Sequence, residues 1–117
     1  IEKIVFNGDK TLNNFLKMNL KQFKKQDSLK KISIEIESSY EKNILTKDST
    51  GKISNYELVA EIIFIIKPDN KKLIFVEKKI MESMSDKFEE RKYEKIVKQN
   101  FSTSFSNKLI SSLITLK

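Results

Sequence analysis

The 117-residue sequence contains no cysteine, no histidine and no tryptophan, and only two glycines and one proline. Without cysteine, these residues form no disulfide and supply no thiolate to a metal or a reaction. Without histidine, they lack the most common general base and the most common metal ligand. With glycine only at Gly8 and Gly51, they cannot build a glycine-rich phosphate loop. We therefore expect no catalytic residue, no metal site and no cofactor, and a binding protein rather than an enzyme.

Arginine is almost absent, although the net charge is +7: Arg91 is the single arginine among 23 basic residues. Arginine supplies the planar fork that reads guanine and clamps phosphate, so nucleic acid is not the favoured partner. The lysines are spread along the chain, which is typical of a solvated surface, and a functional anion-binding patch is the alternative. The candidate anion contacts lie beside a turn near residue 50 and at the start of the last predicted helix: Lys47, Lys52, Lys87, Arg91 and Lys92.

The length predicts one domain, covering residues 1–117. No apolar run approaches the ~18 residues that span a bilayer. Residues 1–8 predict a short strand that ends at the turn pair Asn7-Gly8. In residues 9–25, apolar side chains recur every three or four positions, which predicts an amphipathic helix capped by Asp9 or Thr11. Its apolar face would consist of Leu12, Phe15, Leu16, Leu20 and Phe23.

Three strands and a second helix are predicted next. Residues 32–46 alternate apolar and polar side chains, which indicates a strand with one buried face that is too long for the first helix to cover. Turns near Gly51 and at residues 68–71 separate it from strands at 52–67 and 72–84. From about Ser85 the spacing becomes helical, and weak helix formers at 102–104 could kink this helix. Its apolar stripe would be Val97, Phe101, Phe105, Leu109, Leu113 and Leu116.

The resulting order is β-α-β-β-β-α. A helix between the first two strands allows a right-handed crossover that leaves them parallel. Each helix has one apolar stripe, so both should cover the same face of the sheet. We expect an α+β fold: a two-layer sandwich with a four-stranded mixed sheet and two helices on one face. Carboxylates beside lysines on the polar faces, namely Glu35, Glu37, Glu89 and Glu90, are expected to be solvated.

The strand at 52–67 is apolar on both faces. Its even-numbered residues match the core face, and a two-residue turn at Asp69-Asn70 would set Ile63 opposite Val76 and Glu61 opposite Lys78. If both helices cover the core face, the opposite face is a bare apolar surface for a partner or an acyl chain. The alternatives are that one helix covers it or that the register differs. This candidate partner surface consists of Val59, Ile63, Ile65, Ile74, Val76 and Ile80.

The order of elements, the turn and strand TGKISNYELVAEIIFII at residues 50–66, and the helix YEKIVKQNFSTSFSNKLISSL at 93–113 together resemble the LPS-assembly lipoprotein (LptE-like) family. In that family a turn glycine is followed by an aromatic residue and a strand, which correspond here to Gly51, Tyr56 and residues 57–64. The last helix of the family carries a segment that matches Ile96, Val97, Lys98 and Phe101. The resemblance covers nearly the whole chain.

This resemblance implies a non-enzymatic lipoprotein on the periplasmic side of the cell outer membrane. A lipidated cysteine would lie in an N-terminal segment absent from this sequence. The protein would plug an LptD-like β-barrel, assist its assembly, and bind lipopolysaccharide on its way to the cell surface. The apolar face and the hairpin near residue 50 would face the barrel, and the five candidate cations would meet lipid A phosphates. The alternatives are an α/β adaptor without a lipid ligand and, less favoured, a nucleic-acid-binding module, for which exposed stacking aromatics are missing.

Overall fold

The computed structural model describes residues 1–23 and 32–115, and its elements follow the predicted order β-α-β-β-β-α. The predicted end of the first helix, Lys24 and Lys25, and the last stripe residue, Leu116, lie outside the described residues. The elements are β1 (Lys3–Gly8), α1 (Lys10–Leu20), the 3₁₀ turn η1 (Lys21–Phe23), β2 (Ser33–Lys47), β3 (Ile53–Lys67), β4 (Lys71–Glu82) and α2 (Lys87–Thr115).

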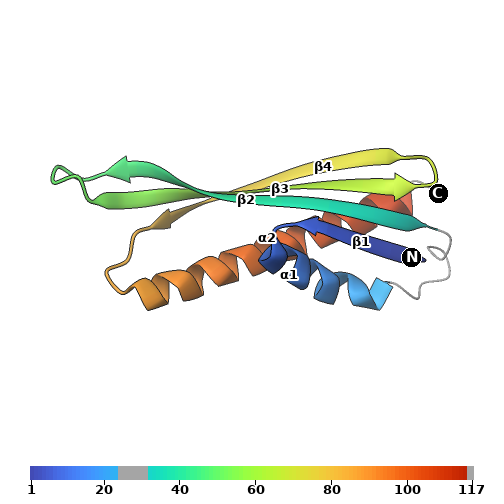
Figure 1. Cartoon of the computed structure of the whole chain (residues 1–117), viewed down its shortest axis with the longest axis horizontal. Coiled ribbons are helices and arrows are strands. Elements are labelled where there is room, and N and C mark those ends of the chain that lie inside the picture. Colours follow the sequence, from blue (N-terminus) through green and yellow to red (C-terminus); the bar gives the residue numbers. More distant parts are fainter. Residues whose placement is uncertain (24–31, 116–117) are drawn as a thin grey trace.

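The four strands form one mixed sheet in the order β1-β2-β3-β4, and both helices pack on the same side of it (Figure 1). β1 pairs with β2 in parallel, because α1 carries the chain back to the start of the sheet. β2, β3 and β4 are joined by tight turns and are antiparallel. The predicted two-layer α+β sandwich is therefore confirmed. Its extents of 56 × 22 × 21 Å make it a long and narrow molecule.

The core lies between the inner face of the sheet and the apolar stripes of the two helices. On β3 the predicted even-numbered positions from Leu58 to Ile66 are all buried, and Phe64 is fully enclosed. On α2 the predicted stripe is buried from Val97 to Leu113. Both patterns arise because a strand repeats every two residues and a helix every 3.6, so one face of each element loses its contact with water.

The connection from β1 to α1 depends on a glycine. Gly8 has a φ of +104°, and a Cβ atom at this position would lie 1.8 Å from the carbonyl oxygen of Ser38. Only glycine permits both the backbone angle and the close approach. The next residue, Asp9, caps α1 by accepting a hydrogen bond of 2.9 Å from the backbone N–H of Leu12. Of the two predicted caps, Asp9 is therefore the one used.

The predicted register of β3 and β4 is wrong by two residues. Ile63 lies opposite Ile74, not Val76, and Glu61 lies opposite Val76, not Lys78. In the observed register the chain reverses its direction between Pro68 and Asp69, one residue before the expected turn. Asn70 adopts a φ of +57°, which asparagine tolerates better than most residues. A shift of two residues preserves the side-chain alternation, so every residue keeps its predicted face.

The second helix continues as α-helix through its serine-rich middle. Ser102 is fully buried and donates a hydrogen bond of 3.2 Å to the backbone carbonyl of Leu12. Asn19 Nδ2 lies 3.5 Å from the hydroxyl of Thr103. Small polar side chains at this point let α1 and α2 approach closely, which explains residues with weak helix propensity inside a long helix.

Candidate functional site

The outer face of the sheet is uncovered by any element that the structure describes (Figure 1). Ile74, Val76 and Ile80 on β4 are 58%, 44% and 58% exposed. Val59, Ile63 and Ile65 on β3 are partly buried by their neighbours in the sheet. Ile63 and Ile74 are direct cross-strand partners, so they form the centre of a continuous apolar surface. The six predicted residues therefore lie together, and we call them the outer apolar surface.

Acidic side chains border this surface along β2 and β3. Glu35 lies opposite Ile65, and Glu37 lies opposite Ile63. Further along the same face lie Glu61, which is exposed, and Glu57, which is partly buried. Two exposed lysines of β4 share this face, since Lys72 lies opposite Ile65 and Lys78 lies opposite Val59. The outer face thus combines an apolar centre with a border of mixed charge, which suits a partner surface with apolar and charged groups.

The hairpin formed by β2 and β3 extends beyond the helix layer (Figure 1). Ile44 and Leu45 are 54% and 46% exposed near its tip. Asp48 organises the turn: its Oδ1 accepts hydrogen bonds from the backbone N–H groups of Thr50 and Lys52 at 2.8 and 3.0 Å. The Thr50 hydroxyl also donates to this oxygen, at 2.6 Å. The hydroxyl bond first, and then the backbone bonds, hold the pKa of Asp48 below its ordinary value. The hairpin therefore ends in an ordered, partly apolar tip.

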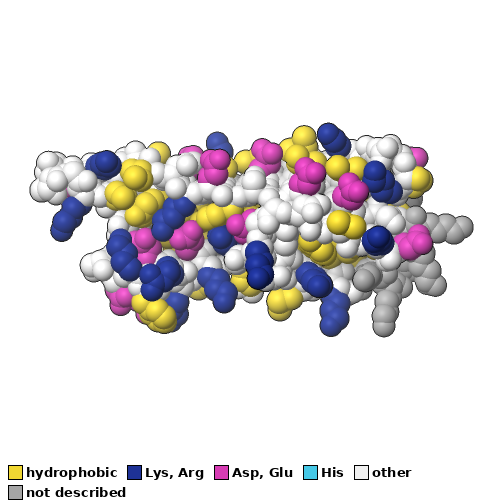
Figure 2. Space-filling view, viewed as in Figure 1, with side chains coloured by type: hydrophobic (Ala, Val, Ile, Leu, Met, Phe, Trp, Pro, Cys, Tyr) yellow, Lys and Arg dark blue, Asp and Glu magenta, His cyan; other side chains and the backbone are white. Residues whose placement is uncertain are grey.

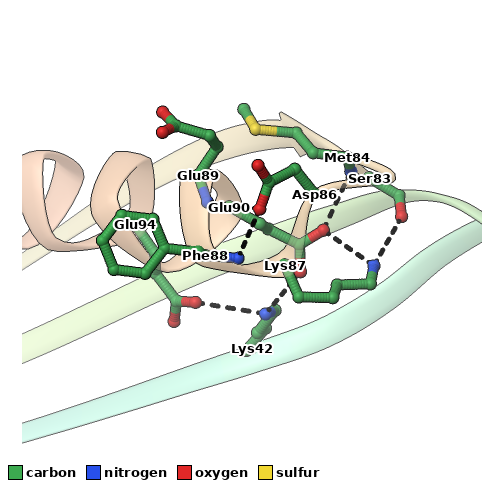
Figure 3. Close-up of polar contacts among 9 residues, drawn as sticks. All are labelled: Lys42, Ser83, Met84, Asp86, Lys87, Phe88, Glu89, Glu90 and Glu94. Carbon is green, nitrogen blue, oxygen red and sulfur yellow. Dashed lines mark hydrogen bonds and ion pairs between the residues drawn. The ribbon is translucent and has the colours of Figure 1, made fainter.

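A buried carboxylate joins the start of α2 to β2 (Figure 3). Glu90 is only 3% exposed, so the expectation that it is solvated is wrong. It lies seven residues before Val97, and hence on the apolar stripe that faces the sheet. Its Oε1 is 3.2 Å from Lys42 Nζ of β2, and its Oε2 accepts hydrogen bonds from Lys87 Nζ at 3.0 Å and from the backbone N–H of Met84 at 2.9 Å.

This cluster keeps its charges in the folded protein. Burial opposes ionisation of Glu90, but the bonds from Met84, Lys87 and Lys42 prevail and lower its pKa to about 2. For Lys42, burial favours the neutral amine, but Glu94 and Glu90 raise the pKa of the ammonium group overall. Glu94 also accepts the hydroxyl hydrogen of Tyr40. Burial and this bond raise the pKa of Tyr40, which therefore stays neutral. Tyr40 and Tyr56 are partly buried and pack against the core.

The five candidate cations lie in different surroundings. Lys52 and Lys87 both line a hollow of about 690 Å³ between the β2–β3 hairpin and the start of α2. Lys87 is already engaged there by Glu90 and by the Ser83 hydroxyl at 3.3 Å. Lys47, at the end of β2, is exposed. The structure therefore brings two of the five together, and of these two only Lys87 has an ion pair with another described residue.

Arg91 and Lys92 point outward from the first turns of α2, and both are exposed. Arg91 borders a second hollow, of about 360 Å³, whose lining includes Thr11, Lys95 and Lys98. Lys92 Nζ lies 3.9 Å from Glu89 and 5.7 Å from the centre of the Phe88 ring. Lys95 and Lys98 also line this hollow, but they were not among the predicted candidate cations. Lys95 lies four residues after Arg91, and Lys98 lies four residues after Glu94. This helical spacing is the signal that could have added them to the candidates.

The described residues carry no group of three or more histidine, cysteine or acidic side chains arranged to hold a metal ion. Within residues 1–23 and 32–115, no helix is long and apolar enough to cross a membrane.

No protein-family model matches this sequence, and a search of curated proteins gives no match either. Solved structures with the same fold are nevertheless found. Rare lipoprotein B from Shewanella oneidensis superposes with a TM-score of 0.62 at 15% identity, covering 97% of this chain and 95% of that one. A minor lipoprotein from Acinetobacter baumannii gives 0.61 at 13% identity, covering 95% and 94%. Lipoprotein B from Nitrosomonas europaea gives 0.63 at 15% identity, covering 92% and 79%.

These likenesses span nearly the whole chain, so the similarity includes all its elements and not one supersecondary unit. At 12–15% identity they establish the fold alone. All three of these neighbours are lipoproteins, which is the class of protein that the sequence resemblance indicates. The chain therefore has the α+β fold found in rare lipoprotein B.

Proposed function

We propose that this domain is a non-enzymatic lipoprotein of the outer membrane that plugs a β-barrel lipopolysaccharide translocon, assists its assembly and binds lipopolysaccharide during delivery. The observation that carries the proposal is the likeness to rare lipoprotein B over 97% of this chain and 95% of that protein. Because the match covers nearly all of both chains, neither contains a large insertion that would add a different functional element.

The outer apolar surface supports the plug role. Monomeric proteins rarely leave contiguous apolar surface in water, and here Ile74 and Ile80 are more than half exposed. A barrel interior that encloses the domain would cover this face. The shape is also suitable, because extents of 22 and 21 Å across and 56 Å along give a slender body.

The plug role can be tested at the outer apolar surface. The double variant Ile74→Glu, Ile80→Glu changes two exposed residues, so the domain should remain folded. We expect it to lose a β-barrel partner that wild type retains on affinity purification from detergent-solubilised membranes. The matched control is Asn100→Glu, Asn107→Glu, which adds the same charge at exposed positions of α2. Retention of the barrel by the outer-face variant would contradict the proposal.

Lipopolysaccharide binding is assigned to the free cations near the hairpin and α2. Lys52 lines a hollow, and Arg91 is exposed beside another, so both can reach phosphate groups. We expect Lys52→Gln, Arg91→Gln to weaken binding to lipopolysaccharide in a fluorescent displacement assay, whereas Lys78→Gln, Lys79→Gln on β4 should not. Equal affinity of wild type and the first variant would remove these residues from the proposed contact.

A further inference from the structure

The outward face of the first half of α2 combines exposed apolar side chains with cations. Phe88 and Ile96 are 60% and 53% exposed. Arg91, Lys92 and Lys95 are exposed between and beside them. At 100° per residue, these five positions fall on one side of the helix, opposite Glu90 and Val97, which are buried against the sheet. We call these five residues the α2 outer face.

Two of the three cations on this face are free to act outward. Arg91 and Lys95 have no carboxylate within ion-pair distance among the described residues. Of the nearby carboxylates on α2, two turn inward: Glu90 binds Lys42 and Lys87, and Glu94 binds Lys42 and Tyr40. The third, Glu89, is exposed and lies 3.9 Å from Lys92. Figure 2 shows basic side chains gathered over the first half of α2.

The two sides of the molecule differ in charge. The opposite, outer side of the sheet has mixed charge, because Glu35, Glu37 and Glu61 lie on the same face as Lys72 and Lys78. An anionic surface would attract the α2 outer face more strongly than this mixed face, so electrostatics would favour an orientation with the helices toward that surface.

We infer that the α2 outer face binds the surface of an anionic phospholipid bilayer, with Phe88 and Ile96 entering the interface and Arg91, Lys92 and Lys95 meeting lipid phosphates. The physical basis is that of interfacial amphipathic helices, in which aromatic and aliphatic side chains enter the headgroup region and flanking cations provide attraction. Burial of the exposed Phe88 ring in this interface would remove apolar surface from water, while the cations beside the ring stay in contact with lipid phosphates. This inference goes beyond the proposed function and does not require a barrel or lipopolysaccharide.

The binding is tested with vesicles of phosphatidylglycerol mixed with phosphatidylcholine, and with pure phosphatidylcholine vesicles for comparison. Wild type should sediment with the anionic vesicles at low salt and be released at high salt, because screening shortens the reach of the lysines. Since each cation near such a surface contributes ~1 kcal/mol, Arg91→Gln, Lys95→Gln should weaken vesicle binding about 30-fold. The control Lys78→Gln, Lys79→Gln removes the same charge from β4 and should have an effect of about twofold or less.

Insertion of the ring is tested separately, because the chain contains no tryptophan. Phe88→Trp introduces the only one, and its emission should shift to shorter wavelength on anionic vesicles and be quenched by brominated lipid. Ile80→Trp is the matched control, since Ile80 is 58% exposed on the outer face of the sheet, on the side away from α2. Its emission should not change. Circular dichroism checks that both variants are folded.

Three results would overturn the inference. The first is the absence of wild-type binding to anionic phospholipid vesicles, including the case in which the domain binds only lipopolysaccharide micelles. The second is an equal loss of binding from the α2 and β4 double variants, which would indicate attraction by net charge alone. The third is an unchanged emission of the Phe88→Trp variant on vesicles that it binds. None of these results would affect recovery of a barrel partner, so the two proposals fail independently.

Discussion

The contribution of Glu90 to stability can be calculated from its surroundings and tested by one isosteric substitution. The pKa of Glu90 is lowered from 4.5 to about 2 in the folded protein. Since a tenfold change in proton affinity corresponds to ~1.4 kcal/mol, this difference sets an upper limit of about 3 kcal/mol on the stabilisation at neutral pH. The side chains of Lys42 and Lys87 are 29% and 56% exposed, and water screens their charges. We therefore expect Glu90→Gln to cost about 1–2 kcal/mol at pH 7.

The pH dependence of this stabilisation has a definite sign. Because the pKa of Glu90 is lower in the folded than in the unfolded chain, the stabilisation is complete above its ordinary value of 4.5 and is lost as the pH falls toward 2. The free-energy difference between wild type and Glu90→Gln should therefore shrink over this range. Urea unfolding followed by circular dichroism at several pH values measures it.

Glu89→Gln is the matched control for this experiment. Glu89 is adjacent in sequence, its side chain is 56% exposed, and its distance to Lys92 is 3.9 Å. An exposed pair of this kind contributes little, so the variant should lie within about 0.5 kcal/mol of wild type at every pH. Equal stability of the two variants at pH 7, or a wild-type advantage over Glu90→Gln that stays constant down to pH ~2.5, would refute the role assigned to the buried carboxylate.

Two further substitutions test the packing. Gly8→Ala should cost more than about 2 kcal/mol in thermal unfolding, because its Cβ would meet the Ser38 carbonyl oxygen at 1.8 Å. The control Gly51→Ala places its Cβ near no atom within 4 Å, so it should cost only about 1 kcal/mol through its positive φ. Similar costs for the two variants would contradict the close approach at Gly8. Phe105→Ala should cost about 3–5 kcal/mol because the ring is fully buried, whereas Phe88→Ala should change stability by less than about 0.5 kcal/mol. A small effect at Phe105 would place the core elsewhere.

Much of the fold follows from side-chain periodicity alone. The alternation in residues 32–46 identifies β2 and its inward face, and the stripe from Val97 to Leu113 identifies the buried side of α2. Two helices with one stripe each place both on the same side of the sheet. The residues of the outer apolar surface follow from the same alternation, which a register error of two residues leaves intact.

The details that the sequence could not predict depend on contacts between distant residues or on backbone geometry. The β3–β4 register follows from the backbone at Pro68 and Asn70, which the pattern of apolar residues does not specify. Glu90 looks like a solvated charge until Lys42, 48 positions away, is placed beside it. Its position on the apolar stripe was the available signal. Lys87 likewise seemed from the sequence to be available for an anion, because its partner Glu90 was expected to be solvated.

We propose that the domain serves a β-barrel of the outer membrane, and affinity purification of the full-length protein tests this proposal most directly. The bait is expressed in its own source cells, the membranes are solubilised in detergent, and the retained proteins are separated with and without heating. We expect one stoichiometric partner whose electrophoretic mobility changes on heating, as is typical of a β-barrel. Recovery of the bait alone, from membranes that contain such a barrel, would contradict it.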